Sequence, residues 1–273
     1  MTSHAPPTSL ATVLLLKSED AKYAEPFRSH GYNIVFSDVL AFFNENVDAL
    51  HKILRSLDQY VGLIITSPRA ASAIVSVVRS VAREEAQELL ASLQRVSIYS
   101  VGATTSKPLR ELGLSCLGED SGSAEVLSTF IADTGNVNGP MVFFCGDKRM
   151  QALPTSFDGR SQRLDELVVY SSRQVEEIVW LKTNIPQWVV FFSPSGVDAA
   201  QRMTNVPWGA IKKAALGTNG TRDGKSSAAA LEKAALLHHD KSWEAKAVAA
   251  KPTPEELVAA IVAHDKLATT SSD

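Results

Sequence analysis

The most constraining feature of this sequence is an apolar strand that runs directly into Ser-Pro, and it occurs twice. The two copies read LIITSPRA at 63–70 and VVFFSPSG at 189–196. In each copy the serine is suited to cap a helix, and the proline fits the first helical position, where its missing N–H is not needed. The helix that follows begins with free backbone N–H groups, which bind anions with help from the helix dipole. The repetition predicts two similar domains, each with an anion-binding helix end.

Predicted strands alternate with predicted helices along the chain. The strands are short apolar runs at 12–16, 33–36, 62–66, 97–101 and 141–145. Helical spacing of apolar residues follows at 23–30, at 47–57 and from the first Ser-Pro to about 79. This alternation is typical of α/β domains with parallel sheets. A chain of 273 residues is long for one such domain and sufficient for two.

The internal repeat extends beyond Ser-Pro. Similar segments recur at an offset of roughly 115–130 residues, and the pairs are 12–17 with 141–146, 38–41 with 167–170, 100–105 with 215–220, and 123–127 with 253–257. A repeat of this length indicates one α/β unit used twice, because solenoid arrays have much shorter periods.

Composition and charge exclude several classes of protein. The net charge of −3 gives no general electrostatic support for a nucleic-acid partner. No apolar stretch approaches the length of about 18 residues that a membrane span needs, and residues 1–9 lack the features of a signal peptide. The two cysteines, Cys116 and Cys145, end apolar runs and are expected to be buried reduced thiols. We therefore expect a cytoplasmic protein without nucleic-acid or membrane partners.

Two short patterns resemble cofactor or metal motifs and are rejected. GTRDGKS at 220–226 is one residue short of a phosphate-binding P-loop, and no Gly-x-Gly-x-x-Gly occurs. The adjacent His238 and His239 point in different directions on a helix and have no cysteine or acidic partner at ligand spacing. The sequence therefore predicts neither a cofactor nor a metal.

The order and spacing of several motifs together resemble the uroporphyrinogen-III synthase family, in its fungal-type form. These motifs are TSPRA at 66–70, VGATT at 101–105, FCG at 144–146 and FFSPSG at 191–196. The resemblance implies two α/β domains joined by two extended linkers, with a cleft between them. One domain would combine 1–40 with 172–273, and the other would be 41–171, with linkers at 39–43 and 167–171.

Such enzymes close the linear tetrapyrrole hydroxymethylbilane into uroporphyrinogen III, with inversion of ring D and loss of water. Departure of a hydroxyl gives an azafulvene cation, which ring D attacks to form a spiro intermediate that fragments and recloses. Because the substrate also closes spontaneously without inversion, the enzyme acts mainly by holding one conformation. The resemblance implies no cofactor, a small-molecule substrate rich in carboxylates, and a handover from hydroxymethylbilane synthase. Nothing in the sequence demands more than a monomer.

The resemblance also assigns roles to individual residues. Tyr170 matches a family tyrosine that assists departure of the hydroxyl, since a phenol with a pKa of about 10 stays protonated at neutral pH; the alternative is an aromatic ring that only packs near a linker. Thr105 matches a threonine that lines the cleft, or else makes a plain helix-start contact. Ser67 and Ser193 are expected to cap their helices rather than bind, whereas Ser195 is better placed to meet a carboxylate.

The remaining candidates for substrate binding follow strand ends or helix starts, and they are Lys17, Arg69, Thr104, Gly146, Lys148, Arg149 and Gly196. The second Gly-x-Thr-Thr site of the family departs from its pattern here and reads GTNGT at 217–221, so either Thr218 or Thr221 would occupy the threonine position. An insertion is expected at 221–250, and its part from 228 to 250 is expected to be a long helix and loop without assigned function.

A second hypothesis comes from another class of protein. The same two domains would suit a non-catalytic binder of a small anionic ligand, and such a binder would not require Tyr170. The two hypotheses are separated by the isomer of uroporphyrinogen that forms in the presence of the protein.

Overall fold

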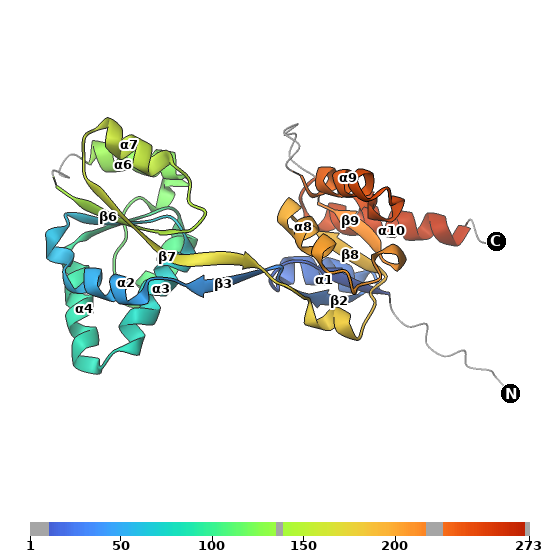
Figure 1. Ribbon diagram of the computed structural model, residues 1–273, viewed down its shortest axis with the longest axis horizontal. Coiled ribbons are helices and arrows are strands. Elements are labelled where there is room, and N and C mark those ends of the chain that lie inside the picture. Colours follow the sequence, from blue (N-terminus) through green and yellow to red (C-terminus); the bar gives the residue numbers. More distant parts are fainter. Residues whose placement is uncertain (1–10, 135–138, 217–225, 271–273) are drawn as a thin grey trace. The chain divides into compact units, whose positions relative to one another are not determined.

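The computed structural model describes residues 11–134, 139–216 and 226–270, and the chain forms two compact units (Figure 1). Unit 1 comprises Met1–Ala41 with Gln174–Asp273, and unit 2 comprises Phe42–Arg173. Each unit is built on a five-stranded sheet with helices packed on both faces. This architecture confirms the predicted class of two similar parallel-sheet α/β domains.

The sheet of unit 1 is parallel throughout. Its strand order is β10 (Ala245–Val248), β9 (Lys212–Ala215), β8 (Trp188–Phe191), β1 (Thr12–Leu15) and β2 (Asn33–Phe36). The helices of this unit are α1 (Ala21–Ser29), α8 (Pro194–Arg202), α9 (Ser227–His238) and α10 (Pro254–Thr270).

The sheet of unit 2 has the order β3 (Leu40–Asn44), β7 (Leu164–Gln174), β6 (Met141–Gly146), β4 (Gly62–Ile65) and β5 (Ser97–Ser100). From β7 to β5 the strands are parallel, and a parallel bridge from Tyr99 to Leu117 extends the sheet beyond β5. The helices are α2 (Val47–Arg55), α3 (Pro68–Ser80), α4 (Arg83–Arg95), α5 (Ala103–Arg110), α6 (Ala124–Asp133) and α7 (Ala152–Gly159).

The chain passes between the units through two neighbouring strands, β3 and β7 (Figure 1). Backbone hydrogen bonds join Val175 to Val39 at one end of the pair and Glu45 to Val169 at the other, so the two strands are antiparallel. The sequence placed one linker at 167–171, but Tyr170 still pairs with Gly146 of β6. Most of that segment is therefore part of the sheet of unit 2, and the chain leaves this unit only after Arg173.

Alternate residues of the central strands supply the cores on opposite faces of each sheet, as the two-residue period of a strand requires. In β4, Leu63 and Ile65 pack with α2, α3 and α4, whereas Ile64 packs with α6 and α7 on the other face (Figure 1). In β1, Leu14 faces α8 and α9, and Val13 faces α1 and α10. The duplicated sequence thus produces the same layered arrangement twice.

The prediction for 228–250 is wrong in part. Residues 227–238 form α9, but 245–248 form β10, the edge strand that pairs with β9. Its sequence AKAV contains two alanines and one lysine, and only its third residue, Ala247, is buried. Alanine and lysine are poor strand formers, so the signal for a strand was weak. No helix within the described ranges is both long and apolar enough to cross a membrane.

Candidate active site

The strand order of unit 2 reverses between β4 and β6, because β5 lies beside β4 and β7 lies on the far side of β6. In open α/β sheets, ligands bind beyond the carboxyl ends of the strands at such a reversal. Ser67 follows β4, Gly146 ends β6, and Tyr170 of β7 pairs with Gly146. Three residues predicted for the site therefore lie at the switch point of this sheet.

Gly146 leaves the space that the ring of Tyr170 occupies. A Cβ atom at residue 146 would lie 2.4 Å from Cζ of Tyr170 and 2.6 Å from its hydroxyl oxygen. Residue 146 is therefore a glycine because the half-buried ring of Tyr170 leaves no room for a side chain there. The Tyr170 hydroxyl makes no hydrogen bond within the described part of the chain, so this group is available to a ligand.

Arg69 stacks on Phe42, which in turn contacts Tyr170. The guanidinium carbon of Arg69 lies 3.1 Å from the centroid of the Phe42 ring. The rings of Phe42 and Tyr170 have centroids 6.4 Å apart and are tilted by 50°. Arg69 is exposed, and within the part of the chain that the structure describes no carboxylate lies at ion-pair distance from it. Its positive charge is thus available to an anion near Tyr170.

The loop after β6 is held against β7. Lys148 donates a hydrogen bond of 3.0 Å to the carbonyl of Ser172, and the Asp147 carboxylate accepts one of 3.1 Å from the Ser172 N–H. Arg149 forms an ion pair with Glu166, and this hydrogen bond raises the pKa of the arginine. Lys148 is exposed and keeps its charge available, whereas Arg149 is already neutralised.

The two predicted threonines of unit 2 differ in accessibility. They lie in the first turn of α5, after Gly102, whose φ of 82° favours glycine. Thr104 is exposed, but Thr105 is buried, with only 4% of its surface accessible. In the structure, Thr104 and the first N–H groups of α5 are therefore the accessible groups, and Thr105 packs inside.

In unit 1 the corresponding switch point lies between β8 and β1. The Ser193 hydroxyl accepts a hydrogen bond of 3.3 Å from the N–H of Gly196 and lies 2.9 Å from the Ser195 hydroxyl. In unit 2, the Ser67 hydroxyl accepts one of 3.2 Å from the N–H of Arg69. Both serines therefore cap their helices as predicted. A Cβ at Gly196 would meet no atom closer than 3.7 Å, so space does not require this glycine.

Lys17, which follows β1, already has partners. Its ammonium nitrogen lies 2.7 Å from the Asp20 carboxylate and 3.9 Å from the centroid of the Tyr23 ring. The hydrogen bond from Lys17 lowers the pKa of the Asp20 carboxyl group below its ordinary value. A substrate carboxylate that binds Lys17 must therefore compete with Asp20.

The remaining predictions concern the end of unit 1. Thr218 and Thr221 lie outside the described residues, as does most of the P-loop-like segment at 220–226. The ring of His238 lies 2.9 Å from the side-chain oxygen of Gln201. Over 11–134, 139–216 and 226–270, the structure brings no three histidine, cysteine, aspartate or glutamate residues together in a way that would hold a metal ion.

Comparison with known proteins identifies the family. Residues 21–259 match the family model described as "Uroporphyrinogen-III synthase HemD". The chain belongs to the uroporphyrinogen-III synthase family. These enzymes are cyclising lyases of tetrapyrrole biosynthesis, and the alternative of a non-catalytic binder is not favoured.

One sequence relative supports this membership, and one solved structure shares the fold. The chain is 28% identical to the uroporphyrinogen-III synthase of Schizosaccharomyces pombe over 202 residues, which cover 69% of this chain and 78% of the relative. The crystal structure of uroporphyrinogen-III synthetase from Helicobacter pylori aligns with 93% of this chain and 99% of its own, with a TM-score of 0.53 and 12% identity. The second comparison shows the shared fold.

Phe42 is a candidate site residue that the sequence did not predict. The sequence predicted 39–43 as a linker. A large aromatic side chain in such an extended segment could have indicated that its ring packs against a neighbouring side chain. The structure places it beside Tyr170.

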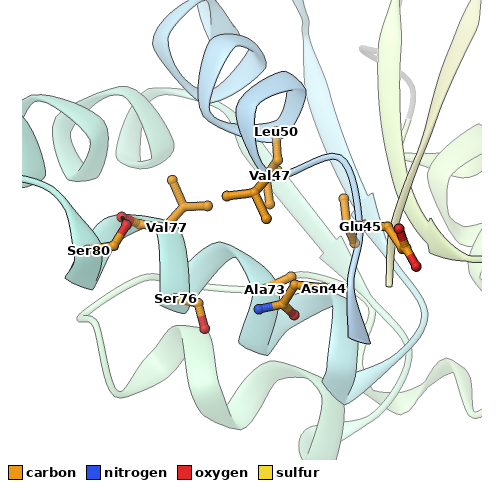
Figure 2. Close-up of a pocket in the computed structure, with 9 residues that line it drawn as sticks. Asn44, Glu45, Val47, Leu50, Ala73, Ser76, Val77 and Ser80 are labelled. Carbon is orange, nitrogen blue, oxygen red and sulfur yellow. Dashed lines mark hydrogen bonds between the residues drawn. The ribbon is translucent and has the colours of Figure 1, made fainter. Parts of the chain in front are cut away.

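Unit 2 also contains a pocket of about 190 Å³ between α2 and α3 (Figure 2). Val47, Leu50 and Val77 form its apolar walls, and Glu45 lies at its edge. None of the predicted site residues lines it. A typical pocket for a drug-sized ligand measures about 300–1,000 Å³, so this one is too small for a tetrapyrrole.

Proposed function

We propose that this chain closes hydroxymethylbilane to uroporphyrinogen III, and that Tyr170 assists the departure of the hydroxyl as water. The observation that carries the activity is the family match over residues 21–259. The role of Tyr170 is supported by its position at the switch point of unit 2, where its hydroxyl is available and an unpaired arginine lies nearby.

The reaction requires that the protein hold the substrate in one conformation and supply one proton donor. A phenol is protonated at neutral pH and can donate a hydrogen bond to the leaving oxygen. As the carbon–oxygen bond breaks with its electron pair on oxygen, the phenol proton passes to that oxygen, which leaves as water. An azafulvene cation and the Tyr170 phenolate remain, and the phenolate takes up the proton that the substrate releases when the last pyrrole ring regains aromaticity. The substituted carbon of ring D attacks this cation and forms a spiro intermediate. This intermediate fragments and recloses with ring D inverted. Holding the substrate in the conformation for that attack is the main contribution of the enzyme.

We propose that residues of both units contribute contacts to the substrate. In unit 2 the contacts would come from Arg69, Lys148, Thr104 and the first N–H groups of α3 and α5. In unit 1 they would come from Ser195 and the N–H groups at the start of α8, together with Thr218 or Thr221. These groups suit carboxylates, because helix N-termini and cationic side chains both bind anions.

We further propose a cytoplasmic location, which the two free cysteines support, and a direct handover of substrate from hydroxymethylbilane synthase. Handover would protect a substrate that closes spontaneously without inversion. In a coupled reaction, handover keeps the fraction of type III product constant when both enzymes are diluted at a fixed ratio. A fraction that falls on dilution would show that the substrate diffuses freely.

The activity is tested with purified protein and freshly prepared hydroxymethylbilane, followed by oxidation of the products and chromatographic separation of the isomers. We expect the type III isomer to dominate, and an isomer ratio equal to that without protein would refute the activity. Tyr170→Phe should lower the rate about 100-fold, since general acid catalysis contributes at least that much. Tyr60→Phe is the matched control, because the Tyr60 hydroxyl binds Asp165. A Tyr170→Phe variant with the full rate would remove this residue from the mechanism.

A further inference from the structure

Phe42 makes a cation–π contact with Arg69 and a ring contact with Tyr170. It lies on β3, next to the strand that carries Tyr170. Its ring is half-buried, and its centroid lies 3.1 Å from the guanidinium carbon of Arg69 and 6.4 Å from the centroid of Tyr170. Aromatic pairs at this separation attract each other. Phe42 therefore links the available cation to the available phenol.

Contacts with aromatic rings and with Gly146 hold these two groups. The Tyr170 hydroxyl and the Arg69 guanidinium have no side-chain hydrogen-bond partner among the described residues, so neither is fixed by a polar contact. On the side of β6, the Tyr170 ring lies directly against Gly146. The Arg69 guanidinium is held over the Phe42 ring by cation–π attraction, and its N–H groups stay available for a carboxylate.

We propose that Phe42 is a positioning residue for the cyclisation. It fixes the Tyr170 phenol and the Arg69 guanidinium relative to each other, so that a carboxylate held by Arg69 places the leaving hydroxyl beside the phenol. This inference rests on the proposed function of Tyr170. Phe42 itself undergoes no chemical change. Misplacement of a catalytic group by about 1 Å can cost about 100-fold in rate, so the ring that sets this geometry affects catalysis without touching the reacting atoms.

Phe43 provides a matched control on the same strand. It is the next residue, it is also aromatic, and it also lies near an arginine, since the guanidinium carbon of Arg173 is 4.9 Å from its ring centroid. Its ring is more exposed, at 45%, and among the ring pairs of the described residues Tyr170 pairs with Phe42 and not with Phe43. Leucine at either position removes one ring and one cation–π contact, but only the change at residue 42 disturbs Tyr170.

The kinetic test compares kcat and KM for type III formation in Phe42→Leu, Phe42→Tyr and Phe43→Leu. We expect Phe42→Leu to lower kcat at least about tenfold and to raise KM, whereas Phe42→Tyr restores the ring and Phe43→Leu stays close to the parent. In a Tyr170→Phe background, Phe42→Leu should still raise KM but leave kcat nearly unchanged. Equal losses at 42 and 43, or a full further loss of kcat in that background, would overturn the proposal.

A stability measurement tests the stack independently of activity. If Phe42 holds Arg69, the loss of melting temperature in Phe42→Leu/Arg69→Met is smaller than the sum of the two single losses, because both changes remove one contact. If the two losses of melting temperature are additive, Phe42 does not hold Arg69, and the proposal is refuted even if the enzyme is active. Conversely, a parent protein that forms no excess of type III refutes the proposed function, while this thermal cycle still decides whether Phe42 holds Arg69.

Discussion

Replacing Gly146 by alanine should displace the Tyr170 ring and thereby slow the reaction. The added Cβ would lie 2.4, 2.6 and 2.8 Å from three atoms of that ring. Carbon atoms in contact are normally about 3.5–4.0 Å apart, so the ring must withdraw by about 1 Å. A misplacement of that size costs about 100-fold in rate. The obstacle is a side chain, so the backbone can stay, and the free energy of unfolding should fall by only about 1–3 kcal/mol.

The assay measures initial rates of type III formation and urea unfolding of the same preparations. Gly159→Ala is the control, since a Cβ at that position would meet no atom within 4 Å. In a Tyr170→Ala background, Gly146→Ala should no longer reduce stability, because the clashing ring is absent. A Gly146→Ala variant with parental rate and stability would refute the reasoning, since Tyr170 could then not lie against residue 146.

Three further changes test the architecture of unit 1. Burial lowers the pKa of Lys213 from 10.5 to about 8; the native state then releases this proton before the unfolded state does, so stability should rise by about 3 kcal/mol between pH 8 and 10.5. Lys213→Met should lack this rise, and parallel pH curves from urea unfolding would contradict it. Ser193→Ala removes a helix cap and should cost about 1 kcal/mol in thermal unfolding, whereas Ser193→Asp should retain most of it; equal losses would argue against capping. Asp265→Ala should cost about 1.5–3 kcal/mol at neutral pH, because the carboxylate accepts hydrogen bonds from Tyr32, Trp188 and Lys212. Burial opposes ionisation of Asp265, but these hydrogen bonds outweigh it and lower its pKa. The difference from the parent should therefore shrink as the pH falls below about 4, and a constant difference would exclude the ionised carboxylate as its source.

Features determined by neighbouring residues could be predicted from the sequence. The Ser-Pro caps depend on one turn of backbone, and both serines accept the expected N–H hydrogen bonds. The central strands were visible as apolar runs because both faces of a parallel sheet are buried. The edge strand β10 was missed, because its alanines and lysine carry little strand signal.

Features determined by contacts across the fold could not be predicted. Tyr170 and Gly146 are 24 positions apart, and their proximity depends on the register of β7 against β6, which a single sequence leaves open. Whether Thr104 or Thr105 is accessible depends on the rotation of α5 about its own axis, and the structure exposes the first and buries the second. The pairing of Lys17 with Asp20 likewise depends on side-chain directions that strand-end position alone does not fix.

The two switch points share a backbone design but differ in charge. In both, a serine caps a Ser-Pro helix whose first N–H groups point beyond the sheet. In unit 1 the nearby cation, Lys17, is neutralised by Asp20, and Ser195 is linked to the capping serine. In unit 2 the nearby cation, Arg69, is stacked on an aromatic ring that leaves its charge available. Both units therefore have the same Ser-Pro helix start, while among the described residues an arginine without an ion-pair partner and a tyrosine lie together at the switch point of unit 2. This asymmetry suits the proposed cyclisation. The substrate carries many carboxylates but loses its hydroxyl at a single carbon, so a proton donor is required at only one position.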